Sequence, residues 1–127
     1  MALDGAFLRH LKHEIEIVAL GNRVDKIYQP NHDELFLFLR SREGTQKLLL
    51  SARANSARIH LVNSTPENPK YPPMFCMLLR KRLIGARLVQ IRQPSLERVL
   101  LLDFDGTDEL GDTVRLTLAV EIMGRYS

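Results

Sequence analysis

The sequence has one cysteine, no tryptophan and few aromatic residues, which excludes several classes of protein. The single cysteine, Cys76, rules out a disulfide within the chain and fits a reducing compartment. Because aromatic residues make up only 6% of the chain, the core must be mainly aliphatic. The longest apolar runs have about six residues, whereas a membrane-spanning helix needs roughly 20. The N-terminus lacks the basic-then-apolar order of a secretory signal, so we expect a cytoplasmic chain with no membrane partner.

Length and composition fit one globular domain. At 127 residues, with 45% apolar and 26% charged residues, the chain is long enough to bury a sizeable core. Residues 121–127 end the sequence without a polar tail. We therefore expect residues 1–127 to form a single domain that is an N-terminal fragment of a longer protein.

Charge is unevenly distributed, although the net charge is only +3. Residues 103–112 contain five acids and no base, whereas residues 70–98 contain one acid, Glu97, and seven bases. These bases are Lys70, Arg80, Lys81, Arg82, Arg87, Arg92 and Arg98. Such asymmetry predicts a basic surface for polyanions. From charge alone, the alternative is an ordinary solvated surface whose strand arginines pair with the acidic turn.

Hydrophobic periodicity predicts two helices and seven strands. We expect helices at 4–20 and from Pro72-Pro73 to Gly85, and strands at 23–29, 33–41, 45–52, 58–62, 87–93, 98–104 and 113–123. The apolar face of the first helix is expected to comprise Leu3, Phe7, Leu11, Ile15 and Val18, and that of the second Phe75, Leu78, Leu79 and Leu83. Because short turns join consecutive strands, the pairing should be antiparallel. The fold class is therefore α+β, an antiparallel β-sandwich-like domain with two flanking helices.

One stretch resembles a catalytic motif. Residues 100–107, LLLDFDGT, match the opening of haloacid-dehalogenase-type phosphatases, in which the first Asp is the nucleophile and the second a general acid/base. Those enzymes also need a parallel sheet, a downstream Lys and a further acidic pair for Mg²⁺. The 20 residues after Thr107 contain no Lys. We therefore interpret Asp103 and Asp105 as part of an acidic glycine turn between two strands.

No other residues suggest a catalytic or metal centre. His10, His13 and Glu14 lie one turn apart on the first helix, but the spacing is not His-Glu-x-x-His and no third ligand is indicated. Exposed helix histidines are the favoured interpretation. Cys76 beside an apolar helix face is interpreted as a small buried side chain. We expect no catalytic residue, no metal and no cofactor.

Several segments, taken together, resemble one family. They are residues 3–8, 50–52, 57–61, 72–81 (PPMFCMLLRK) and 121–127 (EIMGRYS), spread over the whole chain. The set is similar to the N-terminal (NFACT-N) domain of the RqcH/NEMF ribosome-quality-control proteins, whose bacterial members are often called fibronectin-binding protein A-like. The resemblance implies a fold like the N-terminal domain of formamidopyrimidine-DNA glycosylases. Ala2 and Leu3 stand where those glycosylases have their catalytic Pro and Glu, so glycosylase chemistry is not expected.

The resemblance implies an adaptor that binds tRNA and the large ribosomal subunit carrying a stalled peptidyl-tRNA. Such factors support C-terminal alanine tailing of stalled chains, while the ribosome performs the peptide transfer. The family's tRNA-contacting Asp-Arg pair matches Glu97-Arg98, where Glu replaces Asp.

Further contacts are expected at phosphates. Arg80, Lys81 and Arg82 are the candidates, with Arg58 and Arg125 ranked lower. The alternatives are a fibronectin-binding surface adhesin, or an enzyme of the glycosylase or phosphatase type.

Overall fold

The sheet contains seven antiparallel strands, as the alternation of the sequence predicts. The computed structural model describes residues 5–32, 34–51, 58–62, 73–94 and 99–121. Within these residues the elements are α1 (Gly5–Ala19), β1 (Arg23–Asn31), β2 (Glu34–Ser41), β3 (Gly44–Ser51), β4 (Arg58–Val62), α2 (Met74–Leu83), β5 (Arg87–Arg92), β6 (Val99–Thr107) and β7 (Thr113–Glu121). The sheet order is β4-β3-β2-β1-β5-β6-β7. The predicted α+β class, with two helices, is confirmed.

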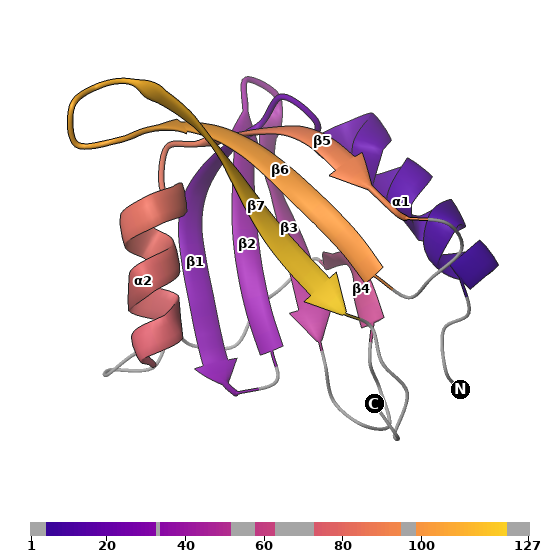
Figure 1. Ribbon diagram of the computed structural model, residues 1–127. Coiled ribbons are helices and arrows are strands. Elements are labelled where there is room, and N and C mark those ends of the chain that lie inside the picture. Colours follow the sequence, from indigo (N-terminus) through magenta and orange to yellow (C-terminus); the bar gives the residue numbers. More distant parts are fainter. Residues whose placement is uncertain (1–4, 33, 52–57, 63–72, 95–98, 122–127) are drawn as a thin grey trace.

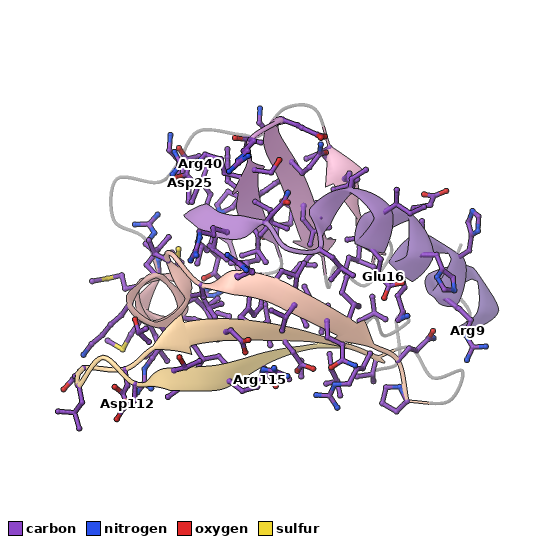
Figure 2. All side chains as sticks on the ribbon, turned by 90° about the horizontal axis from the view of Figure 1, so that it is seen from above. Arg9, Glu16, Asp25, Arg40, Asp112 and Arg115 are labelled. Carbon is purple, nitrogen blue, oxygen red and sulfur yellow. The ribbon has the colours of Figure 1, made fainter. Side chains whose placement is uncertain are left out.

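The sheet divides into two layers that meet at one end. Strands β1 and β5 share a single register pair, Arg23↔Arg87, whereas the other neighbouring strands pair along most of their lengths. Strands β1–β4 therefore form one layer and β5–β7 cross over it as a second (Figure 1). Seen from above, α1 and α2 lie at opposite sides of the two layers (Figure 2). The result is sandwich-like, with the join between layers at the start of β1 and β5.

One apolar cluster fills the space between the layers. Its largest fully buried members are Phe104, Ile15, Ile27, Leu37, Leu39, Leu48, Ile59, Leu88, Leu100 and Leu102, drawn from both layers and from α1. Helix α2 contributes Cys76, Leu79 and Leu83. A smaller cluster of Phe36, Phe38 and Leu49 is buried apart from it. The core is mainly aliphatic, as the composition predicts.

The predicted apolar faces of both helices need correction. In α2 the buried residues are Cys76, Leu79 and Leu83, whereas Phe75 and Leu78 are about half exposed. In α1, Ile15 and Ala19 are buried while Val18 is exposed. Because a helix advances about 100° per residue, positions four apart share a face, and each small residue (Cys76, Ala19) lies against the core. Neither helix in the described part of the chain is long and apolar enough to cross a membrane.

The acidic glycine turn lies further along the chain than predicted, and Asp105 belongs to the strand together with Asp103. Strand β6 continues through both to Thr107, and the turn occupies the next residues. There the Asp108 carboxylate accepts hydrogen bonds at 2.9 Å from the backbone N–H groups of Leu110 and Asp112, and Gly111 adopts a φ of +84°. Strand β1 likewise extends through Pro30 to Asn31, past the predicted break. The register is irregular there, where proline is tolerated in a strand.

Candidate nucleic-acid interface

A row of charged residues crosses five neighbouring strands at the join of the two layers. The register pairs are Arg40↔Arg23, Arg23↔Arg87, Arg87↔Asp105 and Asp105↔Arg115. Directly opposite residues on antiparallel strands project from the same face of a sheet. Since the neighbours Val24, Leu88 and Phe104 point into the core, the charged row lies on the outer face. We call these five residues the arginine row.

The two outer arginines of the row have carboxylate partners. The Arg40 Nη1 atom lies 3.8 Å from the Asp25 carboxylate, and the Arg115 Nε atom lies 2.5 Å from that of Asp105. Figure 2 shows Arg40 beside Asp25 in the upper layer and Arg115 on the lower one.

The two central arginines are close together and lack such a partner among the described residues. The backbone N–H groups of Val24 and Leu88 donate to the carbonyls of Ala86 and Asn22. This pattern makes Arg23 and Arg87 a non-hydrogen-bonded pair, in which side chains approach most closely, with Cα atoms about 4.5 Å apart. The Arg23 guanidinium donates to the Gly85 carbonyl at 2.9 Å. Like charges directly opposite each other destabilise a sheet, so we expect repulsion between these two arginines to oppose folding.

The end of α2 adds two more cations beside this pair. Gly85, at a φ of +85°, ends the helix segment, and its N–H donates to the Val24 carbonyl at 2.8 Å. Gly106 packs against the same segment from the other side, where a Cβ atom would lie 3.4 Å from that of Ala86, near ordinary contact. These two contacts hold Lys81 and Arg82, both exposed, against the start of β5.

Together the four cations line one open pocket. Its volume is about 540 Å³ and its lining includes Arg23, Lys81, Arg82, Arg87 and the paired carboxylate of Asp105. We call it the basic pocket. It has more cations than the neighbouring pocket, to which Lys81 and Arg82 also contribute, and its electrostatics favour a polyanionic ligand.

The predicted phosphate-contacting residues do not all lie together. Lys81 and Arg82 line the basic pocket, but the Arg80 Nε–H donates to the Ile27 carbonyl at 2.9 Å beneath α2. Helical geometry separates them, since successive side chains point about 100° apart. Glu97, Arg98 and Arg125 lie outside the described residues, and so does the side chain of Arg58.

The Asp103 carboxylate is buried and hydrogen-bonded to Arg92, whose side chain is partly exposed. Arg92 donates to it twice, at 2.7 and 2.9 Å, and the Thr117 hydroxyl donates at 2.7 Å. Only 3% of the Asp103 side chain is exposed. The hydrogen bonds from Arg92 lower the pKa of Asp103 more than its burial raises it, and they raise the pKa of Arg92. Both acids of the phosphatase-like motif therefore have arginine partners.

The remaining candidates from the sequence occupy ordinary structural environments. His10 and His13 are exposed on α1, His10 pairing with Glu14 at 3.0 Å and His13 with Glu16 at 3.2 Å. Among the described residues, no group of three or more His, Cys, Asp or Glu side chains could hold a metal ion. Cys76 is buried, as predicted, and burial raises the pKa of its thiol.

Sequence reasoning missed Arg23 as a site residue. Arg23 lies 58 positions before Lys81 and outside the basic stretch, so composition gave no sign of it. The signal that could have found it is the alternation of β1, which places Arg23 outside when Val24 is inside.

Comparisons with known proteins identify the family. Residues 4–127 match the family model described as NFACT N-terminal and middle domains. The chain is 40% identical over its full length to the Rqc2 homolog RqcH of Bacillus subtilis and 43% identical to that of Streptococcus suis. It spans only 22% and 23% of the lengths of these two relatives.

Solved structures agree with this assignment. One is the N-terminal part of the fibronectin/fibrinogen-binding protein of Streptococcus suis, which matches with a TM-score of 0.93 and 42% identity over 98% of this chain and 47% of that one. Another is the N-terminal domain of the fibronectin-binding protein PavA of Streptococcus pneumoniae, with a TM-score of 0.91 and 40% identity over 98% of this chain and 49% of that one. The chain therefore belongs to the NFACT N-terminal family, the family of the ribosome-quality-control factors called RqcH.

Proposed function

We propose that this chain is a tRNA- and large-ribosomal-subunit-binding adaptor domain of a cytoplasmic, ribosome-associated quality control factor. In this proposal the whole factor supports C-terminal alanine tailing of stalled nascent chains, and the ribosome carries out the peptide transfer. The domain's contribution is to position the tRNA, so it needs no catalytic centre or cofactor.

The basic pocket is the observation that carries this proposal. Four cations converge on one cavity, and Asp105, the only acid among the described residues that line it, is paired with Arg115. The opposing Arg23 and Arg87 favour a ligand with negative charge, because such a ligand relieves their repulsion. Phosphates of tRNA or ribosomal RNA supply that charge. Family membership supports the same partner class.

The test is binding of labelled tRNA by fluorescence anisotropy, beside duplex DNA of equal length, at low and near-physiological salt. The wild type is compared with Glu97→Ala/Arg98→Ala. We expect preferential tRNA binding that weakens steeply with salt and falls in the double variant while its circular dichroism spectrum is unchanged. Equal, weak binding of both nucleic acids would contradict the proposal. Co-sedimentation with large ribosomal subunits tests the second partner.

A second candidate function is fibronectin binding, because two solved relatives carry that activity in their names. Surface plasmon resonance on immobilised fibronectin distinguishes the two functions. Saturable binding that the tRNA-deficient variant retains would favour the adhesin. Fractionation of cells expressing the full-length protein adds a second criterion, since an adhesin must reach the surface.

The absence of a catalytic centre is part of the proposal and has its own test. Asp103 and Asp105 already bind Arg92 and Arg115, which lowers the nucleophilicity expected of a phosphatase aspartate. In a phosphatase assay with Mg²⁺, we expect the wild type and Asp103→Asn to give the same background turnover. Turnover sensitive to that substitution would assign an enzyme.

A further inference from the structure

We infer that the basic pocket binds backbone phosphates of a double-helical RNA segment, through Arg23 and Arg87 with Lys81 and Arg82. The inference rests on the proposed function in assuming that the chain binds RNA. It adds which part of the RNA is bound and which residues bind it, including Arg23, which lies far from the basic stretch of the sequence.

The arrangement of charge points to phosphate oxygens. Arg23 and Arg87 present two guanidinium groups from adjacent strands, and each is a planar fork of donors that matches a phosphate. Lys81 and Arg82 approach from the end of α2. Because the pocket is open at the surface, the sugar–phosphate backbone of an RNA can pass through it and continue on both sides.

The lining of the pocket argues against recognition of bases. Among the described residues that line the pocket, none has an aromatic side chain. Single-stranded RNA and free nucleotides are usually held by stacking on aromatic residues. Double-helical RNA, in contrast, is recognised mainly through shape, phosphates and 2′-hydroxyl groups. The chemistry of the pocket fits the second mode.

Two threonines can distinguish RNA from DNA at this site. Thr107 lies two residues after Asp105 and therefore on the same face of β6, and Thr113 is directly opposite it on β7. Their hydroxyl groups, at the edge of the basic pocket, can donate to and accept from a ribose 2′-hydroxyl.

Among the described residues, the lining of the basic pocket does not reach the far end of β5. Arg87 begins β5 and Arg92 ends it, and the expected contact residue Glu97 follows Arg92 by five positions in the sequence. Six strand residues separate these ends by about 17 Å. A single phosphate cannot bridge that distance, but one folded RNA can contact both. Variants of the two sites should therefore be separable.

The experiment titrates the 127-residue chain into three labelled probes of matched length: duplex RNA, an unpaired RNA strand and duplex DNA. We expect duplex RNA to bind most tightly. Arg23→Gln and Arg87→Gln should each weaken it roughly fivefold and reduce the slope of log K against log salt by about one. Arg9→Gln is the matched control, because Arg9 is an exposed arginine on α1, across the molecule from the β6–β7 turn at Asp112 (Figure 2). It should change affinity less than twofold.

Amide chemical shifts in an NMR titration locate the binding site without any substitution. Gly85 and Gly106 line the pocket, so their amides should shift on adding duplex RNA while those of α1 do not. Inorganic phosphate and a mononucleotide are added as competitors. Displacement of the duplex by either at equal phosphate concentration would mean that free phosphate is the ligand, and would overturn the inference.

The outcomes separate this inference from the proposed function. If the wild type binds tRNA but Arg23→Gln and Arg87→Gln bind it equally well, the pocket is not the site and the proposed function stands. If the unpaired strand binds as tightly as the duplex, the double-helical ligand is wrong. If no RNA binds at low salt, both fail together.

A stability measurement shows whether Arg23 acts through the fold. Arg23 is flanked by Arg40 and Arg87, so Arg23→Gln should raise the melting temperature by roughly 1–4 °C at low salt, and less at high salt. A raised melting temperature together with weaker RNA binding supports a binding role. Because Arg23 also donates to the Gly85 carbonyl, a lowered melting temperature with unchanged RNA binding would make Arg23 a structural residue and remove it from the site.

Discussion

At the scale of single residues, the arginines at the two ends of β5 differ in their partners. Arg23 and Arg87 face each other at the start of the strand with no carboxylate between them, a position that binding can use but folding does not favour. At its other end Arg92 is committed to Asp103 by two hydrogen bonds. Net charge and composition cannot distinguish these arginines from one another. Only the register distinguishes a cation that is available to a ligand from one that stabilises the sheet.

Substitution of Asp103 by Asn should destabilise the fold. The change removes a buried carboxylate that accepts from Arg92 and Thr117, and hydrogen bonds to charged groups contribute about 1.5–3 kcal/mol each before relaxation. We expect Asp103→Asn to lower the free energy of unfolding by about 1–3 kcal/mol near neutral pH, measured by urea denaturation. Asp105→Asn is the control, because its pair with Arg115 is solvent-exposed and should contribute less than about 1 kcal/mol.

The same pair gives a pH dependence with a definite sign. The folded-state pKa of Asp103 lies below its ordinary value of 3.8. Its ionised form is therefore preferred by the folded state, and the stabilisation is complete above that value. It is lost as the pH falls through the folded-state pKa. The stability difference between wild type and Asp103→Asn should shrink only below pH 3.8; a difference that disappears near neutral pH would contradict this assignment.

At the scale of elements, the end of α2 sets the shape of the basic pocket. Gly85 adopts a left-handed φ of +85° with nothing within 4 Å of a Cβ atom, so the cost of a side chain there is conformational. Gly85→Ala should lower stability by about 1–2 kcal/mol and weaken RNA binding by misplacing Lys81 and Arg82.

Gly106→Ala provides the matched comparison in thermal unfolding. Gly106 has no left-handed φ, and its added methyl group would meet Ala86 at 3.4 Å, near ordinary contact. We expect Gly106→Ala to lower the stability of the fold less than Gly85→Ala does. The reverse order would mean that close packing against α2, and not the helix ending, positions the pocket.

The elements were largely predictable, and the exceptions have physical causes. Strand β7 follows from the alternation of Val114 to Val120, and the end of α2 follows from Gly85. The acidic turn was misplaced because isolated Asp and Gly favour turns. In the fold, Arg115 supplies a partner to Asp105, and the strand that was predicted to end at 104 continues to Thr107. Long-range partners override local preference, and they are invisible until the strand order is known.

At the scale of the whole molecule, the candidate site also depends on long-range contacts that the sequence alone does not reveal. Lys81 and Arg82 were identified from sequence as a basic cluster, but only the meeting of β1 with β5 brings Arg23 beside them. That meeting is a pairing of strands separated by four intervening elements, which no local pattern encodes. The join between the layers thus creates the candidate site, and the apolar core between the layers must hold that join closed.

The shared core predicts that the two layers unfold together. Leu102 on β6 is fully buried in the cluster that also contains Leu37 and Leu48 of the other layer. Leu102→Ala should cost about 2–5 kcal/mol. Backbone hydrogen bonds join β1 to β5 only near their starts, so we expect most of the coupling to pass through core side chains. Hydrogen exchange of the most protected amides in β2 and β3 should then accelerate by the same free energy as that in β6. Leu110→Ala removes a leucine that is 86% exposed and should alter neither layer. Faster exchange confined to β5–β7 would instead mean that the layers are independent folding units, and that the basic pocket at their join can open without global unfolding.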